Sequence, residues 1–149
     1  MSDEYYMNIA FKLAKKAYKK GDVPVGAVIV KDGKIIGKGY NRKQRDNCAI
    51  YHAEILAIMS ANSKQKSWYL NDCTLYVTLE PCLMCCGAML QSRIRRLVYG
   101  ASCDKFGFAG SIDNVLNNSK NNHFICITSG IMGDKCSSLL KNFFCDKRN

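Results

Sequence analysis

Two short segments of this chain carry side chains that bind metals and move protons. His52 and Glu54 stand two residues apart in the first segment, and Cys82 and Cys85 stand three apart in the second, directly after Pro81. Three protein ligands of the His and Cys type leave the fourth position of a tetrahedral zinc site open for water. Zinc lowers the pKa of that water to about 7, and a neighbouring carboxylate can shuttle its proton. The segments therefore predict a catalytic zinc site with His52, Cys82 and Cys85 as ligands and Glu54 as proton shuttle.

The spacing of the two cysteines is explained if a helix begins at Pro81. Residues three apart share a helix face, Pro is favoured at the first helical position, and the free N–H groups there stabilise thiolates. Cys86 is expected to be a buried thiol and not a ligand. A lone C-x-x-C is also found in redox and structural zinc sites, but a four-Cys site needs a second pair, and this chain has only one.

The elements that must position these residues alternate along the chain. Hydrophobic periodicity and helix or turn signals predict helices over 3–20, 52–60, 82–91 and 136–145, and strands over 25–30, 34–40, 74–79, 95–100 and 123–128, with an Asp-Gly turn between the first two strands. This order predicts a mixed sheet covered by helices on both faces. Sites in such sheets form beyond strand ends and at helix N-termini, where both metal-binding segments begin.

Length and composition favour one globular domain spanning residues 1–149. No run of about 18 apolar residues occurs, and the acidic N-terminus is not a secretory signal, so we expect no membrane association. The nine cysteines are odd in number and lack an exported context, which favours reduced thiols and a cytoplasmic location.

The charge balance favours a polyanionic partner. The chain carries 22 Lys and Arg against 12 Asp and Glu, a net charge of +10. Such an excess is typical of proteins that bind nucleic acids, although lysine-rich surfaces also serve solubility. For the lysines of the first helix alone, a solvated face is the preferred interpretation.

The combination of H-x-E with P-C-x-x-C is the signature of zinc nucleobase deaminases. The chain as a whole resembles the bacterial tRNA-specific adenosine deaminases. That resemblance runs over nearly the full length, through residues 23–28, 40–42, 52–55, 74–82, 85, 87–89, 92–94, 130–131 and 139–144. The metal motif is shared by the whole superfamily, whereas residues 139–144 are more specific to the tRNA-acting branch.

The resemblance implies a fold, an activity and partners. The expected fold is the three-layer α/β/α cytidine deaminase-like fold, with a mixed five-stranded sheet. The expected activity is hydrolytic deamination of the wobble adenosine, anticodon position 34, to inosine in an arginine tRNA, with a zinc-bound hydroxide attacking C6 and Glu54 shuttling protons. One Zn²⁺ per subunit, a homodimer and tRNA lying across that dimer are also implied.

The resemblance further assigns contacts to individual residues. Asn41 is expected to hydrogen-bond the flipped adenine, although by its residue type it could equally be a turn residue. Further substrate contacts are expected at Ala53, Val25 and Leu79. Contacts with tRNA are expected at Phe143, Phe144, Lys105, Lys147 and Arg148. For the two phenylalanines, packing in the core or in a dimer remains an alternative.

Two loops depart from the family pattern. The family usually has Asp-Pro-Thr-Ala before the metal-binding His, where this chain has Cys48-Ala49-Ile50-Tyr51. After Gly100 it usually has an acidic residue where this chain has Cys103, followed by Asp104. Both loops are expected near the tRNA, so the departures bear on anticodon contacts and not on the zinc chemistry.

Two other functions remain open from the sequence. A deaminase of free bases or nucleosides, such as guanine, cytosine or adenine, would share the zinc site, whereas the basic balance favours tRNA. A zinc-stabilised RNA-binding module without activity would be signalled by loss of the glutamate, and Glu54 is present.

Overall fold

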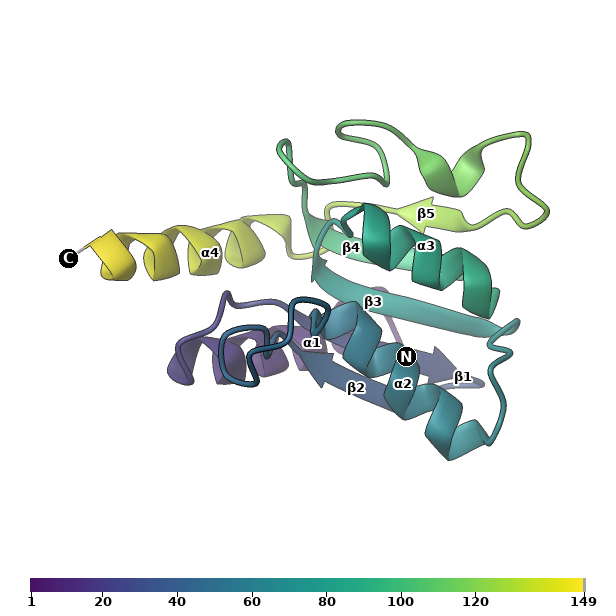
Figure 1. Cartoon of the computed structure of the whole chain (residues 1–149), viewed down its shortest axis with the longest axis horizontal. Coiled ribbons are helices and arrows are strands. Elements are labelled where there is room, and N and C mark those ends of the chain that lie inside the picture. Colours follow the sequence, from purple (N-terminus) through teal and green to yellow (C-terminus); the bar gives the residue numbers. More distant parts are fainter. Residues whose placement is uncertain (149) are drawn as a thin grey trace.

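The protein is built around one five-stranded sheet between helices (Figure 1). The structure is a computed structural model that describes residues 1–148, with Arg148 described by its backbone alone. The strands lie in the order β2-β1-β3-β4-β5, and their bounds are β1 Gly26–Lys31, β2 Lys34–Tyr40, β3 Cys73–Leu79, β4 Arg96–Ala101 and β5 Cys126–Thr128. Strand β1 is antiparallel to β2 and β3, whereas β3, β4 and β5 are parallel, which confirms the predicted mixed sheet.

Helices cover both faces of the sheet, and each face has its own apolar core. Helices α2 (Ala53–Gln65) and α3 (Leu83–Ser92) cover one face, where Ala57 and Met89 join the inward side chains of the strands. Helix α1 (Asp3–Lys19) covers the other face and contributes Met7 and Ala10. Helix α4 (Gly133–Arg148) follows β5 and extends past the end of the sheet (Figure 1, yellow).

Strand β2 carries two glycines that let α2 lie directly on the sheet. A Cβ atom at Gly39 would stand 2.3 Å from the carbonyl oxygen of Ala53, and one at Gly37 would stand 2.4 Å from that of Ala57. Real Cβ atoms do not approach backbone oxygens so closely, so each position requires glycine. This contact fixes the first turn of α2 against the strand, and with it the residue that precedes the helix, His52.

The predicted elements all form, with one-residue shifts at several ends and four further differences. Helix α2 continues five residues beyond its predicted end. These residues were not predicted because the stretch is mostly polar and lacks apolar periodicity. The helix stops at Lys66, which adopts the left-handed conformation. Strand β5 is shorter than predicted, since only three of its residues pair with β4. Helix α4 begins earlier, at Gly133, and ends later. A short 3₁₀ helix at Val115–Asn117 was not predicted. Within residues 1–148, the helices lack the length and apolar character that crossing a bilayer demands.

Candidate active site

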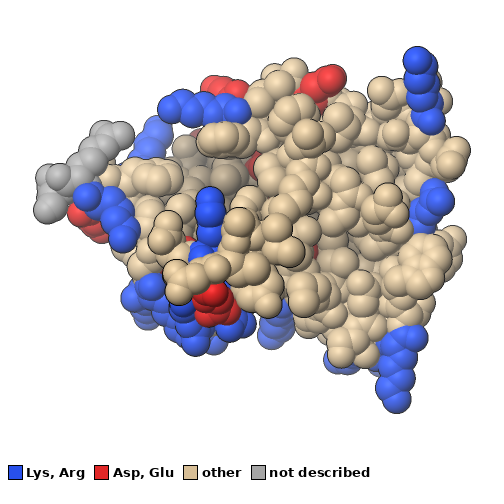
Figure 2. Space-filling model, viewed as in Figure 1, with Lys and Arg blue, Asp and Glu red and all other residues tan. Residues whose placement is uncertain are grey.

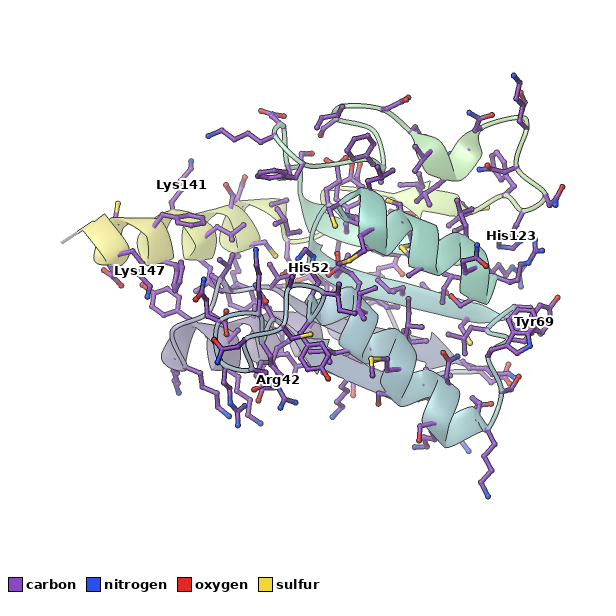
Figure 3. All side chains as sticks on the ribbon, in the orientation of Figure 1. Arg42, His52, Tyr69, His123, Lys141 and Lys147 are labelled. Carbon is purple, nitrogen blue, oxygen red and sulfur yellow. The ribbon has the colours of Figure 1, made fainter. Side chains whose placement is uncertain are left out.

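The residues of the two metal-binding segments lie at the starts of two neighbouring helices. His52 is the N-cap residue of α2 and Cys82 is the N-cap residue of α3, both with extended backbone conformations. Neither side chain makes a capping hydrogen bond, so the imidazole and the thiol remain available for other partners. Figure 3 shows His52 where the first turns of α2 and α3 meet. The fold therefore brings together residues that are 30 positions apart in the chain.

The three candidate ligands have the separation that a tetrahedral metal requires. His52 Nδ1 lies 3.6 Å from Cys82 Sγ and 3.7 Å from Cys85 Sγ. A tetrahedral zinc with bonds of about 2.3 Å to sulfur and 2.0 Å to nitrogen places these atoms about 3.6 Å apart. The three ligand atoms all lie within 4.8 Å of one another, so the donor set fits zinc. Cys86 is buried and directs its thiol to the carbonyl of Pro81 at 3.7 Å, as expected for a thiol outside the ligand set.

The two candidate cysteine ligands shift each other's pKa in opposite directions. A hydrogen bond from the Cys85 thiol, together with one from His52, lowers the pKa of Cys82 to about 4. The same bond to Cys82, followed by burial, raises the pKa of Cys85. The Cys82 hydrogen bond also raises the pKa of His52. One thiolate next to donor groups is the arrangement from which a metal displaces protons when it binds.

Glu54 is a buried carboxyl group beside the ligand group. Its side chain is 4% exposed and it lies in the first turn of α2. Burial, strengthened by the negative charge of Cys82, raises the pKa of Glu54 to about 7. A carboxyl group in such surroundings can hold a proton and release it near neutral pH.

His52, Cys82 and Glu54 line one cavity of about 760 Å³, and Cys85 lies buried behind them. The predicted substrate residues Val25, Asn41, Ala53 and Leu79 line the same cavity, so the fold gathers all of them. Val25 and Leu79 supply apolar walls. A cavity with apolar walls and a few polar groups is suited to a flat, partly apolar ring such as a nucleobase.

Asn41 makes a turn hydrogen bond and also lines the cavity. Its side-chain oxygen accepts a hydrogen bond from the backbone amide of Lys43 at 3.0 Å, and its backbone amide donates to the Val25 carbonyl at 3.0 Å. The side chain is 9% exposed and lines the cavity. The oxygen therefore shapes the turn after β2, while the side-chain amide nitrogen makes no hydrogen bond to residues 1–148.

The residues predicted to touch nucleic acid lie in different surroundings. Phe144 is 46% exposed and lines the cavity together with Lys105. Phe143 is 5% exposed and its ring packs edge-on against Tyr18, so it joins α4 to α1 instead of facing solvent, in agreement with the packing alternative. Lys147, labelled on α4 in Figure 3, lies over the Phe143 ring. Arg148 was also predicted to contact tRNA, and its side chain lies outside the described part of the chain.

Glu80 is a residue of the site that the sequence did not reveal. It lines the cavity and is buried, and its carboxylate accepts hydrogen bonds from the backbone amides of Cys103, Ala109 and Ser111 at 2.9–3.1 Å, and from the Ser111 hydroxyl. The position of Glu80 directly before Pro81 and Cys82 was the one sequence signal that could have placed it in the site. Its partners, 23 to 31 residues further along the chain, could not be inferred from spacing.

The two loops that depart from the family pattern differ in their relation to the cavity. Cys103 and Asp104 line it. So do Phe106 and Leu140, for which no substrate contact was predicted. Cys48 does not line it; its backbone instead closes a turn with Lys43 and Tyr51. Of the two altered positions, only Cys103 can therefore meet a molecule bound in the cavity directly.

Comparison with known proteins supports a zinc-binding deaminase site in this chain. Residues 1–101 match the family model described as the cytidine and deoxycytidylate deaminase zinc-binding region. A tRNA-specific adenosine deaminase of Streptococcus pyogenes (strain MGAS8232) is 44% identical over 94% of this chain and 88% of its own length. That of Bacillus subtilis (strain 168) is 43% identical over 98% of this chain and 91% of its own length.

Solved structures show the same architecture. A structure from a study of A-to-I editing by tRNA:A34 deaminases at the wobble position superposes with a TM-score of 0.88 at 36% identity, covering 91% of this chain and 99% of its own. A guanine deaminase from Nitrosomonas europaea has a TM-score of 0.85 at 26% identity, covering 97% of this chain and 85% of its own. The chain is a zinc-dependent hydrolytic deaminase with the cytidine deaminase-like fold, and it belongs to the tRNA-specific adenosine deaminase family.

Proposed function

We propose that this protein converts the wobble adenosine of a tRNA, anticodon position 34 of an arginine tRNA, to inosine. The observation that carries the proposal is the placement of Glu54 beside the His52, Cys82 and Cys85 group, at a cavity whose volume of about 760 Å³ is large enough for a purine. The identity to relatives named tRNA-specific adenosine deaminases over nearly the whole chain supports tRNA as the substrate.

The proposed roles follow from the site. His52, Cys82 and Cys85 hold the metal, which when bound supplies a water of lowered pKa as the nucleophile. Val25, Leu79 and Ala53 hold the adenine ring, and the Asn41 amide donates to an acceptor on its edge. Glu54 takes one proton from the attacking water and delivers it to N1 as the water oxygen bonds to C6. It then takes the remaining proton from the new C6 hydroxyl and delivers it to the amino group as the C6–N6 bond breaks. The products are inosine and ammonia.

A basic surface beside the cavity supports a polyanionic substrate. Lys20 and Arg45 both contact the hydroxyl of Tyr40, at 3.2 and 3.0 Å, and Lys16 lies over its ring. Figure 2 shows Lys and Arg gathered at the lower left, where α1 and the loop after β2 lie in Figure 1. Asn41 and Lys43 of that loop line the cavity, so the basic surface adjoins it and can hold RNA phosphates.

We also propose a cytoplasmic homodimer with a single deaminase domain in each subunit. The exposed side chains Ile50, Met59 and Leu83 come from the loop before α2 and from α2 and α3, and the face over these helices is nearly free of charged residues (Figure 2). A neutral, partly apolar face is suited to a second copy of the chain. Light scattering of the purified protein should give the mass of two subunits, and Met59→Lys should shift it to that of one.

Inosine formation tests the substrate. The zinc-loaded protein is incubated with an arginine-tRNA anticodon stem-loop that carries adenosine at the wobble position, and with a stem-loop that carries guanosine there. Inosine is expected from the first substrate alone. Glu54→Gln should keep its zinc and its RNA affinity while kcat falls by about 100-fold or more; wild-type turnover by this variant would contradict the role of Glu54.

The second candidate is a free-base deaminase. It is favoured by the structural likeness to the guanine deaminase, which extends over 97% of this chain. Guanine, cytosine, adenine and free adenosine are therefore tested beside the stem-loop. Release of ammonia from a free base, with no inosine from the stem-loop, would replace the tRNA proposal with this one.

A further inference from the structure

Phe106 is an exposed aromatic side chain at the wall of the cavity. It is 67% exposed, more than Phe144, the other aromatic residue that lines the cavity. It lies in the loop after β4, next to Lys105. An apolar ring this open to water gains little from packing within its own chain, so its position at the cavity is the feature to explain.

The loop that carries Phe106 is held in place on both sides of that residue. Before it, the amide of Cys103 donates to the buried Glu80 carboxylate at 3.0 Å. After it, the amide of Gly107 donates to the Cys103 carbonyl at 2.8 Å and the amide of Phe108 donates to that of Pro81 at 3.0 Å. The backbone of Phe106 is therefore fixed to the segment that leads directly into Cys82.

Gly107 shows how closely this loop is pressed onto Glu80. A Cβ atom at Gly107 would lie 2.3 Å from the carboxyl carbon of Glu80. The ring next to it is consequently carried by a fixed backbone, so only its side-chain torsions have to be ordered when a ligand binds. Such preorganisation lowers the entropy cost of a stacking contact.

A polynucleotide that places one base in the cavity exposes the faces of the bases on either side. Aromatic side chains stack on such unpaired bases with little regard to their identity, and a neighbouring cation can meet the phosphate between them. We propose that Phe106 is a stacking platform for an unpaired base next to the target nucleotide, with Lys105 beside it for the backbone. The inference rests on the proposed function and adds to it: contact with Phe106 makes the enzyme prefer a looped RNA to a free base as substrate.

The first experiment compares Phe106→Ala, Phe106→Trp and the control Phe124→Ala with wild type. Phe124 is 63% exposed but does not line the cavity. For the anticodon stem-loop, Phe106→Ala should raise KM about 10-fold with kcat unchanged, which is the size of a lost base–aromatic contact. Phe106→Trp, which keeps a stacking surface, and Phe124→Ala should both behave like wild type. An unchanged KM for Phe106→Ala would overturn the proposal.

The second experiment identifies the stacked base. Dissociation constants are measured by fluorescence anisotropy for stem-loops with an abasic nucleotide on the 5′ or the 3′ side of the target. One of these abasic sites should weaken binding to the wild-type protein. The same abasic site should not weaken binding to Phe106→Ala any further, because that variant has already lost the stacking contact. Equal weakening of both proteins by both abasic sites would exclude stacking on Phe106.

Binding also separates this inference from the proposed function. A wild-type protein that binds the stem-loop in the manner described but forms no inosine would overturn the proposed reaction and leave the stacking role supported. A wild-type protein that forms inosine while Phe106→Ala binds equally well would do the reverse. Absence of any binding to the stem-loop would overturn both.

Discussion

Ser111 donates two hydrogen bonds to the carboxylate of Glu80, one from its backbone amide at 2.9 Å and one from its hydroxyl. The pair joins the segment before α3 to the loop after β4, 31 residues further along the chain. Burial alone would raise the pKa of Glu80, but the donors at Ser111, Cys103 and Ala109 outweigh it and the pKa is lowered. The ionised carboxylate thus organises one wall of the cavity.

Glu80→Gln should loosen this wall. The amide keeps the shape of the side chain but turns an NH₂ group toward N–H donors, and each lost bond to a charged acceptor costs about 1.5–3 kcal/mol. We expect kcat/KM for the stem-loop to fall about 10-fold or more, with zinc content unchanged. Glu4→Gln, an exposed substitution in α1, is the control. Kinetics of Glu80→Gln equal to wild type would show that the loop does not depend on the carboxylate.

The ligand assignment is tested by metal content. Cys82→Ser should lose most of its zinc, since a hydroxyl group binds zinc far more weakly than a thiolate. Cys86→Ala should keep a full complement, because the Cys86 thiol is directed to the Pro81 carbonyl and not to His52. Atomic absorption of the purified proteins measures both. Loss of zinc from Cys86→Ala, with the fold intact by circular dichroism, would place Cys86 in the ligand set.

Sequence reasoning reached the parts of this molecule that depend on local pattern. His52 and Cys82 could be placed at helix starts because turn and helix signals surround them, and the structure puts them there. Packing between distant segments was not accessible in the same way. The burial of Phe143 depends on Tyr18, and the role of Glu80 depends on Ser111. Neither contact leaves a periodic signal, since each partner lies in another element.

Gly39→Ala should destabilise the fold and the metal site together. The new methyl group would meet the carbonyl of Ala53 and push the first turn of α2 away from β2, at a cost of about 1–3 kcal/mol. Because His52 immediately precedes that turn, zinc affinity should fall as well. Gly87→Ala is the matched control, since a Cβ atom there meets nothing within 4 Å. Urea unfolding and zinc titration measure both effects; equal stability of the two variants would contradict the close contact.

The contribution of the Asp3–Arg96 ion pair, which joins α1 to β4, to the free energy of unfolding should depend on pH. Arg96 donates to both oxygens of Asp3, at 2.8 and 2.7 Å, and this contact lowers the pKa of Asp3. A carboxyl group with a lowered pKa stabilises the fold above its unfolded value of about 3.9, and that stability is lost as the pH falls through the folded value. The difference in unfolding free energy between wild type and Asp3→Asn should therefore be constant from neutral pH to about pH 5 and shrink below it. Asp72→Asn, an exposed substitution, is the control. A difference that stays constant down to the lowest pH at which the protein folds would show that the charge of Asp3 contributes nothing.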